Sequence, residues 1–309
     1  MLNNKKFAAG LICVGIVAAI ATITVSIFLG KDYRTDVPQE LDEAVALSTF
    51  TRLGVSMSDI TINGETRHYA DVGENWPYND ETPYKTECLG EGHVILGYRE
   101  KDSTVEVYAI CEADEYCFQN GWLWEWSGYS CMPTLLIFDK DKDGSYLFKS
   151  AEEPSEDPLF GRPVSEFFPS DLVEIAVTAS GDSEIGVSLS RQSLQYAEAY
   201  LVSIGRDGKL GVYCDEDQEI TSLEGAGVAE KVAAALYDLH PEYGVYTGTI
   251  EKREGGKRYV YAVSWNGDLH GNGTVTYSKT EYDTQKVVEE YSYKVKADQY
   301  SLVKPKKKK

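Results

Sequence analysis

CEADEYCFQNGWLWEWSGYSC, residues Cys111–Cys131, decides how the central part of this chain folds. Of the six cysteines and five tryptophans in the chain, three of each lie here, and the tryptophans recur at every second position, at Trp122, Trp124 and Trp126. Successive side chains of a β-strand point to opposite faces, so the three indoles share one face and Leu123 lies on the other. The pattern is typical of a β-hairpin.

Strand-like segments with alternating apolar residues lie on both sides of this stretch. They are GHVILGYRE (92–100), STVEVYAIC (103–111), PTLLIFDK (133–140) and SYLFKSAEE (145–153). Apolar residues at helical spacing predict one helix before them, over Val37–Gly54, and two after them, within 168–180 and 188–205. This order predicts an α+β fold, in which helices pack on an antiparallel β-meander.

The same order recurs in the last part of the chain. A predicted helix over 227–240 is followed by four strand-like runs, over 244–256, 257–267, 273–283 and 285–296. GYREK followed by VYA in the first block matches GTIEK followed by VYA in the second. We therefore expect two α+β domains, over 31–215 and 216–303, and the matching segments are consistent with two related units of one helix and four strands.

The N-terminus predicts a membrane anchor. Residues 7–30 carry no charge, and as a helix they span about 36 Å, which is enough to cross a ~30 Å hydrocarbon core. Lys5 and Lys6 precede the run, which favours a cytoplasmic N-terminus and a body outside the cell membrane. A cleaved signal peptide is the alternative, but its apolar core usually has about 7–15 residues.

Charge excludes one class of partner. The net charge is −20 at pH 7, and the body is more acidic than this because the tail KPKKKK (304–309) is basic. An acidic body repels polyanions, so we do not expect nucleic-acid binding. The tail is predicted to be a solvated, disordered end, or alternatively a tether to anionic envelope polymers or lipid headgroups.

Seven segments carry a resemblance to a known family. They are EGHVILG (91–97), VYAI (107–110), EYCFQNG (115–121), SGYSCMPTLLIF (127–138), AEAYLVSIGR (197–206), PEYGVYTGTIEK (241–252) and VTYSKTEYDTQKVVE (275–289). The chain resembles the extracytoplasmic C-terminal region of clostridial BlaR-type membrane metallopeptidases, a sensor-like region of antirepressor proteins. The resemblance implies an outer sensory domain in a Gram-positive cell envelope.

The chemistry of that family is not carried over. Its peptidases need a His-Glu-x-x-His helix to bind zinc, and none of the four histidines here stands in that arrangement. Penicillin-sensing relatives use the serine of a Ser-x-x-Lys motif as their nucleophile. Ser301 and Lys304 have this spacing, but the motifs that accompany it in those relatives are absent from the sequence. The resemblance therefore implies the outer region without the peptidase domain.

The tryptophan row has two interpretations. On the first interpretation the row forms a core face, because large aromatic side chains are more often buried than functional. The resemblance, however, places Leu123 at a bulky apolar position of the relatives, which turns the indoles outward. Outward rings could stack on a sugar ring or on an apolar patch of another protein. The candidates for such a ligand platform are Trp122, Trp124, Trp126 and Tyr129.

The predicted location outside the cell membrane allows the cysteines to form disulfides. Disulfides persist outside the cell, and the Cys-x-x-Cys pairs of a zinc knuckle are absent from the sequence. We expect at most two bridges, with Cys117–Cys131 the preferred pair because it would close the tryptophan hairpin.

One segment begins like a calcium loop. Asp139, Asp141 and Asp143 stand at the first, third and fifth positions, and Gly144 at the sixth. The twelfth position, which needs a bidentate Glu, is Ser150. The simpler interpretation is a hairpin turn at Asp143-Gly144, so calcium is a weak candidate and we predict no other cofactor.

These patterns together predict a membrane-anchored, extracytoplasmic, non-catalytic binding or sensory module. Its predicted partners are the membrane, through residues 7–30, and an envelope glycan or protein. The alternative is an accessory subunit that docks onto another envelope protein, such as a BlaR-type protease. A hydrolase is a third hypothesis, but the sequence shows no nucleophile–base pair or metal set, so we do not expect an enzyme.

Overall fold

The computed structural model describes residues 33–74, 76, 84–154, 163–179, 181, 183–206, 208–211, 221–268 and 270–303. Residues Tyr33–Lys309 form one compact unit. The predicted anchor over 7–30 and the basic tail over 304–309 lie outside the described residues. Within the described ranges, no helix is long and apolar enough to cross a membrane.

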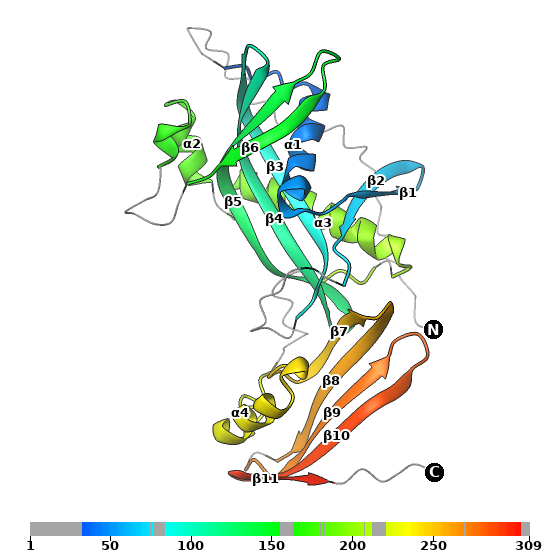
Figure 1. Cartoon of the computed structure of the whole chain (residues 1–309). Coiled ribbons are helices and arrows are strands. Elements are labelled where there is room, and N and C mark those ends of the chain that lie inside the picture. The colour runs from blue at the N-terminus through cyan, green and yellow to red at the C-terminus, as the bar shows by residue number, and fades with distance from the viewer. Residues whose placement is uncertain are drawn as a thin grey trace, which may run out of the picture. The chain divides into compact units, whose positions relative to one another are not determined.

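The predicted α+β class is confirmed (Figure 1). In the described part of the chain, eleven strands form one antiparallel sheet and four α-helices accompany it. The helices are α1 Gln39–Leu53, α2 Val173–Thr178, α3 Glu184–Ser203 and α4 Glu230–Leu239. The strands are β1 Ser58–Ile62, β2 Glu65–Asp71, β3 Thr86–Lys101, β4 Thr104–Gln119, β5 Trp122–Lys140, β6 Tyr146–Glu152, β7 Gly248–Glu254, β8 Lys257–Gly267, β9 Gly273–Glu281, β10 Lys286–Lys296 and β11 Gln299–Val303.

The first meander, β3–β6, is covered on both faces. Leu41 and Val45 of α1 pack on one face, against a cluster that includes Val107 and Phe138. Helix α3 packs on the other face, where its Tyr200 joins the core of β3–β5. Because both faces are covered, β3 and β4 are buried almost continuously, and their buried residues include charged as well as apolar side chains.

Two glycines of β3 set the distance of α3 from the sheet. A Cβ on Gly92 would lie 2.4 Å from the backbone oxygen of Leu189, and a Cβ on Gly90 would lie 2.7 Å from that of Ser193. A side chain at either position would therefore push the helix off the sheet. The helix itself begins at an N-cap, where the hydroxyl of Ser183 accepts a hydrogen bond from the backbone of Gly186.

The second meander, β7–β11, has a core of its own. Helix α4 covers one face and contributes Val232, Ala233 and Leu236 to a cluster of tyrosines and valines from β8–β10. The helix ends at His240-Pro241, as the proline predicts. The predicted four strands are confirmed, and β11 is an addition that the sequence pattern did not predict.

The two meanders meet through a short junction. One register pair, Gln119 with Ile250, joins β4 to β7. The backbone N–H of Asn120 adds a hydrogen bond to the oxygen of Thr249, at 2.8 Å. A helix packs on a face of each meander. The division of the chain into two related domains stays a prediction.

Candidate functional site

The tryptophan row lies on β5, on the face that points away from α3. Leu123 is fully buried and packs with Phe118 of β4 and Tyr200 of α3. Trp122, Trp124 and Trp126 are on the opposite face and are half-buried. The row is therefore neither a closed core face nor a freely exposed platform.

Neighbouring segments hold each indole. The chain at 209–211 runs beside β5, where the N–H of Leu123 donates to the oxygen of Lys209 at 2.7 Å. Gly211 lies against the ring of Trp124, and the Lys209 ammonium lies 5.0 Å from the centre of the Trp122 ring. Tyr129 is separate from the row, since it packs against the core beneath α1.

A pair of substitutions distinguishes the two faces of β5. Leu123→Ala is expected to lower the free energy of unfolding by about 2–5 kcal/mol, because it leaves a cavity in a closed core. Trp124→Ala is expected to cost about 2 kcal/mol or less, because its ring is already partly in water. Chemical denaturation measures both. An equal or larger loss for Trp124→Ala would make the row a core face.

A shallow cleft opens where the two meanders meet. Its enclosed volume is about 10 Å³, which is room for about one water molecule. It is lined by side chains of Tyr84, Gln119, Tyr243, Tyr246, Thr247 and Tyr261, and residues 244 and 248–250 complete it. Ligand sites are typically concave, mostly apolar or aromatic, and carry a few polar groups, which is the composition found here.

The cleft has a buried floor and an exposed rim. Tyr243, Tyr261 and Gln119 are buried, whereas Tyr246 is 40 % exposed at the rim. The Gln119 amide donates to the Tyr84 hydroxyl at 3.3 Å. Burial raises the pKa of Tyr84 to about 12, so its phenol stays neutral at physiological pH.

Tyr84 connects the cleft to the tryptophan row. Its ring centre lies 5.9 Å from that of Trp126, within the range of aromatic pairs. The Trp126 indole N–H donates to the Thr86 hydroxyl at 3.3 Å, which orients the ring. One end of the predicted platform therefore adjoins the cleft, and we take the cleft together with Trp126 as the candidate binding site.

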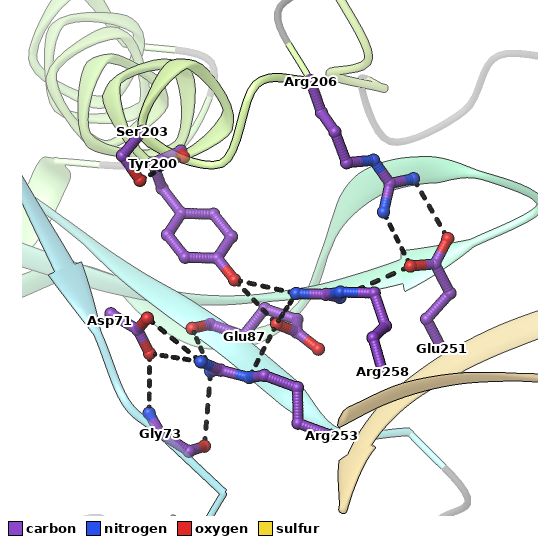
Figure 2. A network of polar contacts seen from close by, with 9 residues as sticks. All are labelled: Asp71, Gly73, Glu87, Tyr200, Ser203, Arg206, Glu251, Arg253 and Arg258. Carbon is purple, nitrogen blue, oxygen red and sulfur yellow. Dashed lines mark hydrogen bonds and ion pairs between the residues drawn. The ribbon is translucent and has the colours of Figure 1, made fainter. Parts of the chain in front are cut away.

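An ion-pair network fixes the junction beside this site. Figure 2 shows the buried carboxylate of Glu87 on β3 between Arg253 of β7 and Arg258 of β8. Its oxygen lies 3.2 Å from the Arg253 Nε and 2.9 Å from an Arg258 Nη, and the Tyr200 hydroxyl donates to it at 2.7 Å. Because these groups come from α3 and three strands, the network ties both meanders together.

A second carboxylate extends the network. Glu251 of β7 is buried and receives two hydrogen bonds from the guanidinium of Arg206, at 2.6 and 3.0 Å. That guanidinium also lies 3.8 Å from the centre of the Phe118 ring. Two parallel hydrogen bonds between a guanidinium and a carboxylate fix the relative orientation of the two groups in addition to pairing their charges. Arg206 therefore anchors the chain after α3 to the second meander (Figure 2).

Two carboxyl groups lie together beneath α3. Glu112 and Asp114 of β4 are both buried, and each acts on the pKa of the other. Burial, then the charge of Glu112, raises the pKa of Asp114 to about 8. One oxygen of each group has no partner among the described residues. The pair is closed to any substrate by α3 and is best understood as part of the core.

A buried histidine lies on the other face of the sheet. His93 contacts Glu91 at 3.1 Å through Nδ1 and Asp42 at 3.2 Å through Nε2. Burial alone would lower its pKa, but the two carboxylates outweigh burial and raise the pKa to about 10. His93 is therefore a protonated structural link between α1 and β3 at neutral pH.

The predicted disulfide is wrong for this fold. Cys117 and Cys131 are both free and buried. Cys117 pairs across the hairpin with Trp124, whereas Cys131 lies next to Met132, the partner of Cys111. The six residue steps from Cys111 to Cys117 span roughly 20 Å of strand, whereas a disulfide needs Cα atoms within about 7 Å.

The three aspartates of the predicted calcium loop do not converge. Asp143 accepts hydrogen bonds from the backbone and side chain of Ser145, while Asp139 pairs with Lys149 at 3.2 Å. Asp141 caps the same turn, which joins β5 to β6 as the hairpin interpretation predicted. Across the described part of the chain, no three His, Cys, Asp or Glu side chains are grouped to hold a metal ion.

Comparison of the chain with protein-family models, with curated proteins and with solved structures finds no match.

Proposed function

We propose that this protein is a non-catalytic binding or sensory module of the cell envelope, held at the cell membrane by one helix over residues 7–30. The N-terminus is then cytoplasmic and the body lies outside. The uncharged run and the lysines before it support this anchor and its orientation. The resemblance to the outer region of BlaR-type proteins supports the sensory role.

The observation that carries the binding function is the tyrosine cleft with Trp126 beside it. The cleft collects aromatic rings and an amide from four separate segments and leaves one ring, Tyr246, at its rim. Aromatic side chains give large contact areas at low entropic cost, and a few polar groups then orient the ligand.

The burial of the Glu112–Asp114 pair supports a non-catalytic role. The two residues are 1 % and 2 % exposed. A general acid or base must come within about 3 Å of the group that it protonates or deprotonates, directly or through one water. Such burial denies a substrate that approach.

We also propose that residues 31–215 and 216–303 are two related domains. In support, each contains a helix packed on one face of an antiparallel meander, α1 on β3–β6 and α4 on β7–β10. The core cluster of the second meander consists of residues from the second range, with Tyr84 packed at its edge.

Capture from an envelope extract tests the binding function. Full-length protein in detergent is immobilised and incubated with delipidated envelope extract, and the retained material is identified by mass spectrometry. Wild type and Tyr300→Ala are expected to retain a component that Tyr246→Ala loses. Tyr246 and Tyr300 are matched in exposure, at 40 % and 39 %, but Tyr246 alone of the two lines the cleft.

The identity of the retained material separates the two candidate functions. A glycan or peptide supports a receptor, whereas a protein retained in equimolar amount supports an accessory subunit, for which the half-buried indoles offer an apolar contact surface. Equal retention by Tyr246→Ala and Tyr300→Ala contradicts the cleft as the binding site.

A further inference from the structure

We propose that the surface around α2 lies against the lipid headgroups of the cell membrane, and that Ile175 and Val177 contact the lipid. This proposal rests on the proposed anchor over residues 7–30, and it names a partner for a surface outside the tyrosine cleft. It is argued from the point at which the body of the protein begins, from the residues beside that point and from the side chains exposed there.

The first described residues are fixed to the first meander. Tyr33 is 8 % exposed, and its hydroxyl donates to a carboxylate oxygen of Asp171 at 2.7 Å. Its ring fills the space beside Gly97, where a Cβ would lie 2.4 Å from the ring. Arg34 then exchanges two backbone hydrogen bonds with Tyr98 of β3, at 2.7 and 2.8 Å. The chain therefore enters the body at a defined place.

The length of chain before Tyr33 brings this place close to the membrane. The uncharged run ends at Gly30, three residue steps before Tyr33. Three steps span at most about 11 Å, because an extended chain advances about 3.3–3.6 Å per residue. The headgroup layer on each side of a bilayer is about 5–8 Å thick, since the bilayer measures about 40–45 Å and its hydrocarbon core about 30 Å. With residues 7–30 across the core, Tyr33 lies at the headgroups or just above them.

Helix α2 lies directly beside Tyr33. Leu172 at its N-cap and Ala176 on its inner side belong to the same core cluster as Tyr33. The outer side of α2 exposes two branched apolar side chains, Ile175 at 42 % and Val177 at 58 %. Transfer of such side chains from water into the interfacial layer is favourable, as it is for amphipathic helices that lie on membranes. The apolar side chains of α2 are therefore exposed where the tether brings lipid near.

Charge determines which feature of the lipid this surface fits. The one charged residue of α2 is Glu174, and the chain as a whole carries a net charge of −20. Anionic headgroups attract clusters of basic residues, which α2 does not carry. The contact is therefore apolar and does not require anionic lipid.

A membrane contact at α2 leaves the candidate binding site free. Tyr98, the partner of Arg34, pairs with Val107 on β4. From there β4 continues to Gln119, which is roughly 40 Å of strand at about 3.3 Å per residue. The second meander joins at Gln119, which also lines the tyrosine cleft. The cleft therefore lies at the far end of β4 from the point at which the chain meets the membrane.

Quenching of a fluorescent label by spin-labelled lipid tests the contact. Full-length protein carrying Cys13→Ala and Cys214→Ser is reconstituted in phosphatidylcholine vesicles that contain a lipid with a nitroxide in its headgroup. The cysteines of the described residues are buried, so the label attaches to an introduced Val177→Cys or Val288→Cys. Val288, on β10 and 48 % exposed, is the control. We expect loss of fluorescence at position 177 and none at position 288, with or without added anionic lipid.

A charge placed on the surface separates apolar contact from proximity alone. Ile175→Asp is expected to reduce the quenching at position 177, because a carboxylate is costly to transfer out of water. Leu302→Asp, on β11 and 53 % exposed, introduces the same charge elsewhere and is expected to leave the quenching unchanged. Both substitutions replace exposed side chains, so both variants are expected to fold.

The outcomes separate this proposal from the proposed anchor, which flotation of the same vesicles reports. If the protein floats with the vesicles but the label at 177 is not quenched, or is quenched no more than the label at 288, the contact is wrong and the anchor stands. Quenching at 177 that Ile175→Asp leaves unchanged also overturns the apolar contact. If the protein does not float with the vesicles, both the anchor and the contact fail.

Discussion

Replacing Glu87 by Ala is expected to lower the free energy of unfolding by about 3–5 kcal/mol. The carboxylate is 1 % exposed and neutralises two guanidinium groups, those of Arg253 and Arg258, that are themselves largely buried. Its removal leaves both cations without their main counter-charge and leaves the Tyr200 hydroxyl without its acceptor. Chemical denaturation of residues 33–309, which form a compact unit, measures the loss.

An exposed ion pair provides the control for this measurement. Asp298 pairs with Lys231 at 3.2 Å, and both side chains are more than half exposed. Asp298→Ala is expected to cost less than about 1 kcal/mol, because exposed pairs are well solvated. A Glu87→Ala variant that unfolds at the same denaturant concentration as Asp298→Ala would show that the network does not hold the junction together.

Stability is expected to fall as the pH rises between about 4 and 8, and Asp114 is expected to cause a large part of this. The folded protein binds a proton at Asp114 with a pKa of about 8, whereas the unfolded chain releases it near the ordinary value of 3.8. Between these values the native state holds more protons than the unfolded state. The group therefore contributes stability that is complete below pH 3.8 and lost as the pH rises through 8, with a slope of up to about 1.4 kcal/mol per pH unit.

Asp114→Asn tests this assignment, because an amide cannot titrate. Denaturation midpoints measured between pH 4.5 and 6.5 are expected to fall less steeply in Asp114→Asn than in wild type. This range avoids His93, whose raised pKa makes its own contribution decline between pH 6.5 and about 10. Asp298→Asn serves as the exposed control, and equal slopes for wild type and Asp114→Asn would contradict a raised pKa of Asp114 beneath α3.

Sequence periodicity predicted the elements that have a clear apolar face. Apolar side chains are buried at helical spacing in α1 and α4 and at alternate positions in the strands of both meanders. Each of these elements can therefore be predicted from its own segment of sequence. The β1–β2 hairpin was missed because most of its side chains are polar and exposed. It is held by strand pairing and by neighbours distant in sequence, which no local pattern contains.

The candidate site was less predictable for the same reason. Tyr84, Gln119, Tyr243 and Tyr261 come from four segments and meet only through the β4–β7 junction. The abundance of tyrosine, 22 in the chain, was the available signal, but it does not say which rings converge. The disulfide prediction failed because β4 continues to Gln119, which moves Cys117 to the far end of the hairpin from Cys131.

Site-specific photo-crosslinking in intact cells tests the central claim most directly. A photoreactive residue replaces Tyr246 at the rim of the cleft, or Leu147 on β6, which is 56 % exposed and serves as the control. If the body lies outside the membrane and binds through the cleft, the probe at position 246 forms an adduct with an envelope glycan or envelope protein, and the probe at 147 does not. Adducts with cytoplasmic proteins, or the same adduct from both positions, would contradict the account.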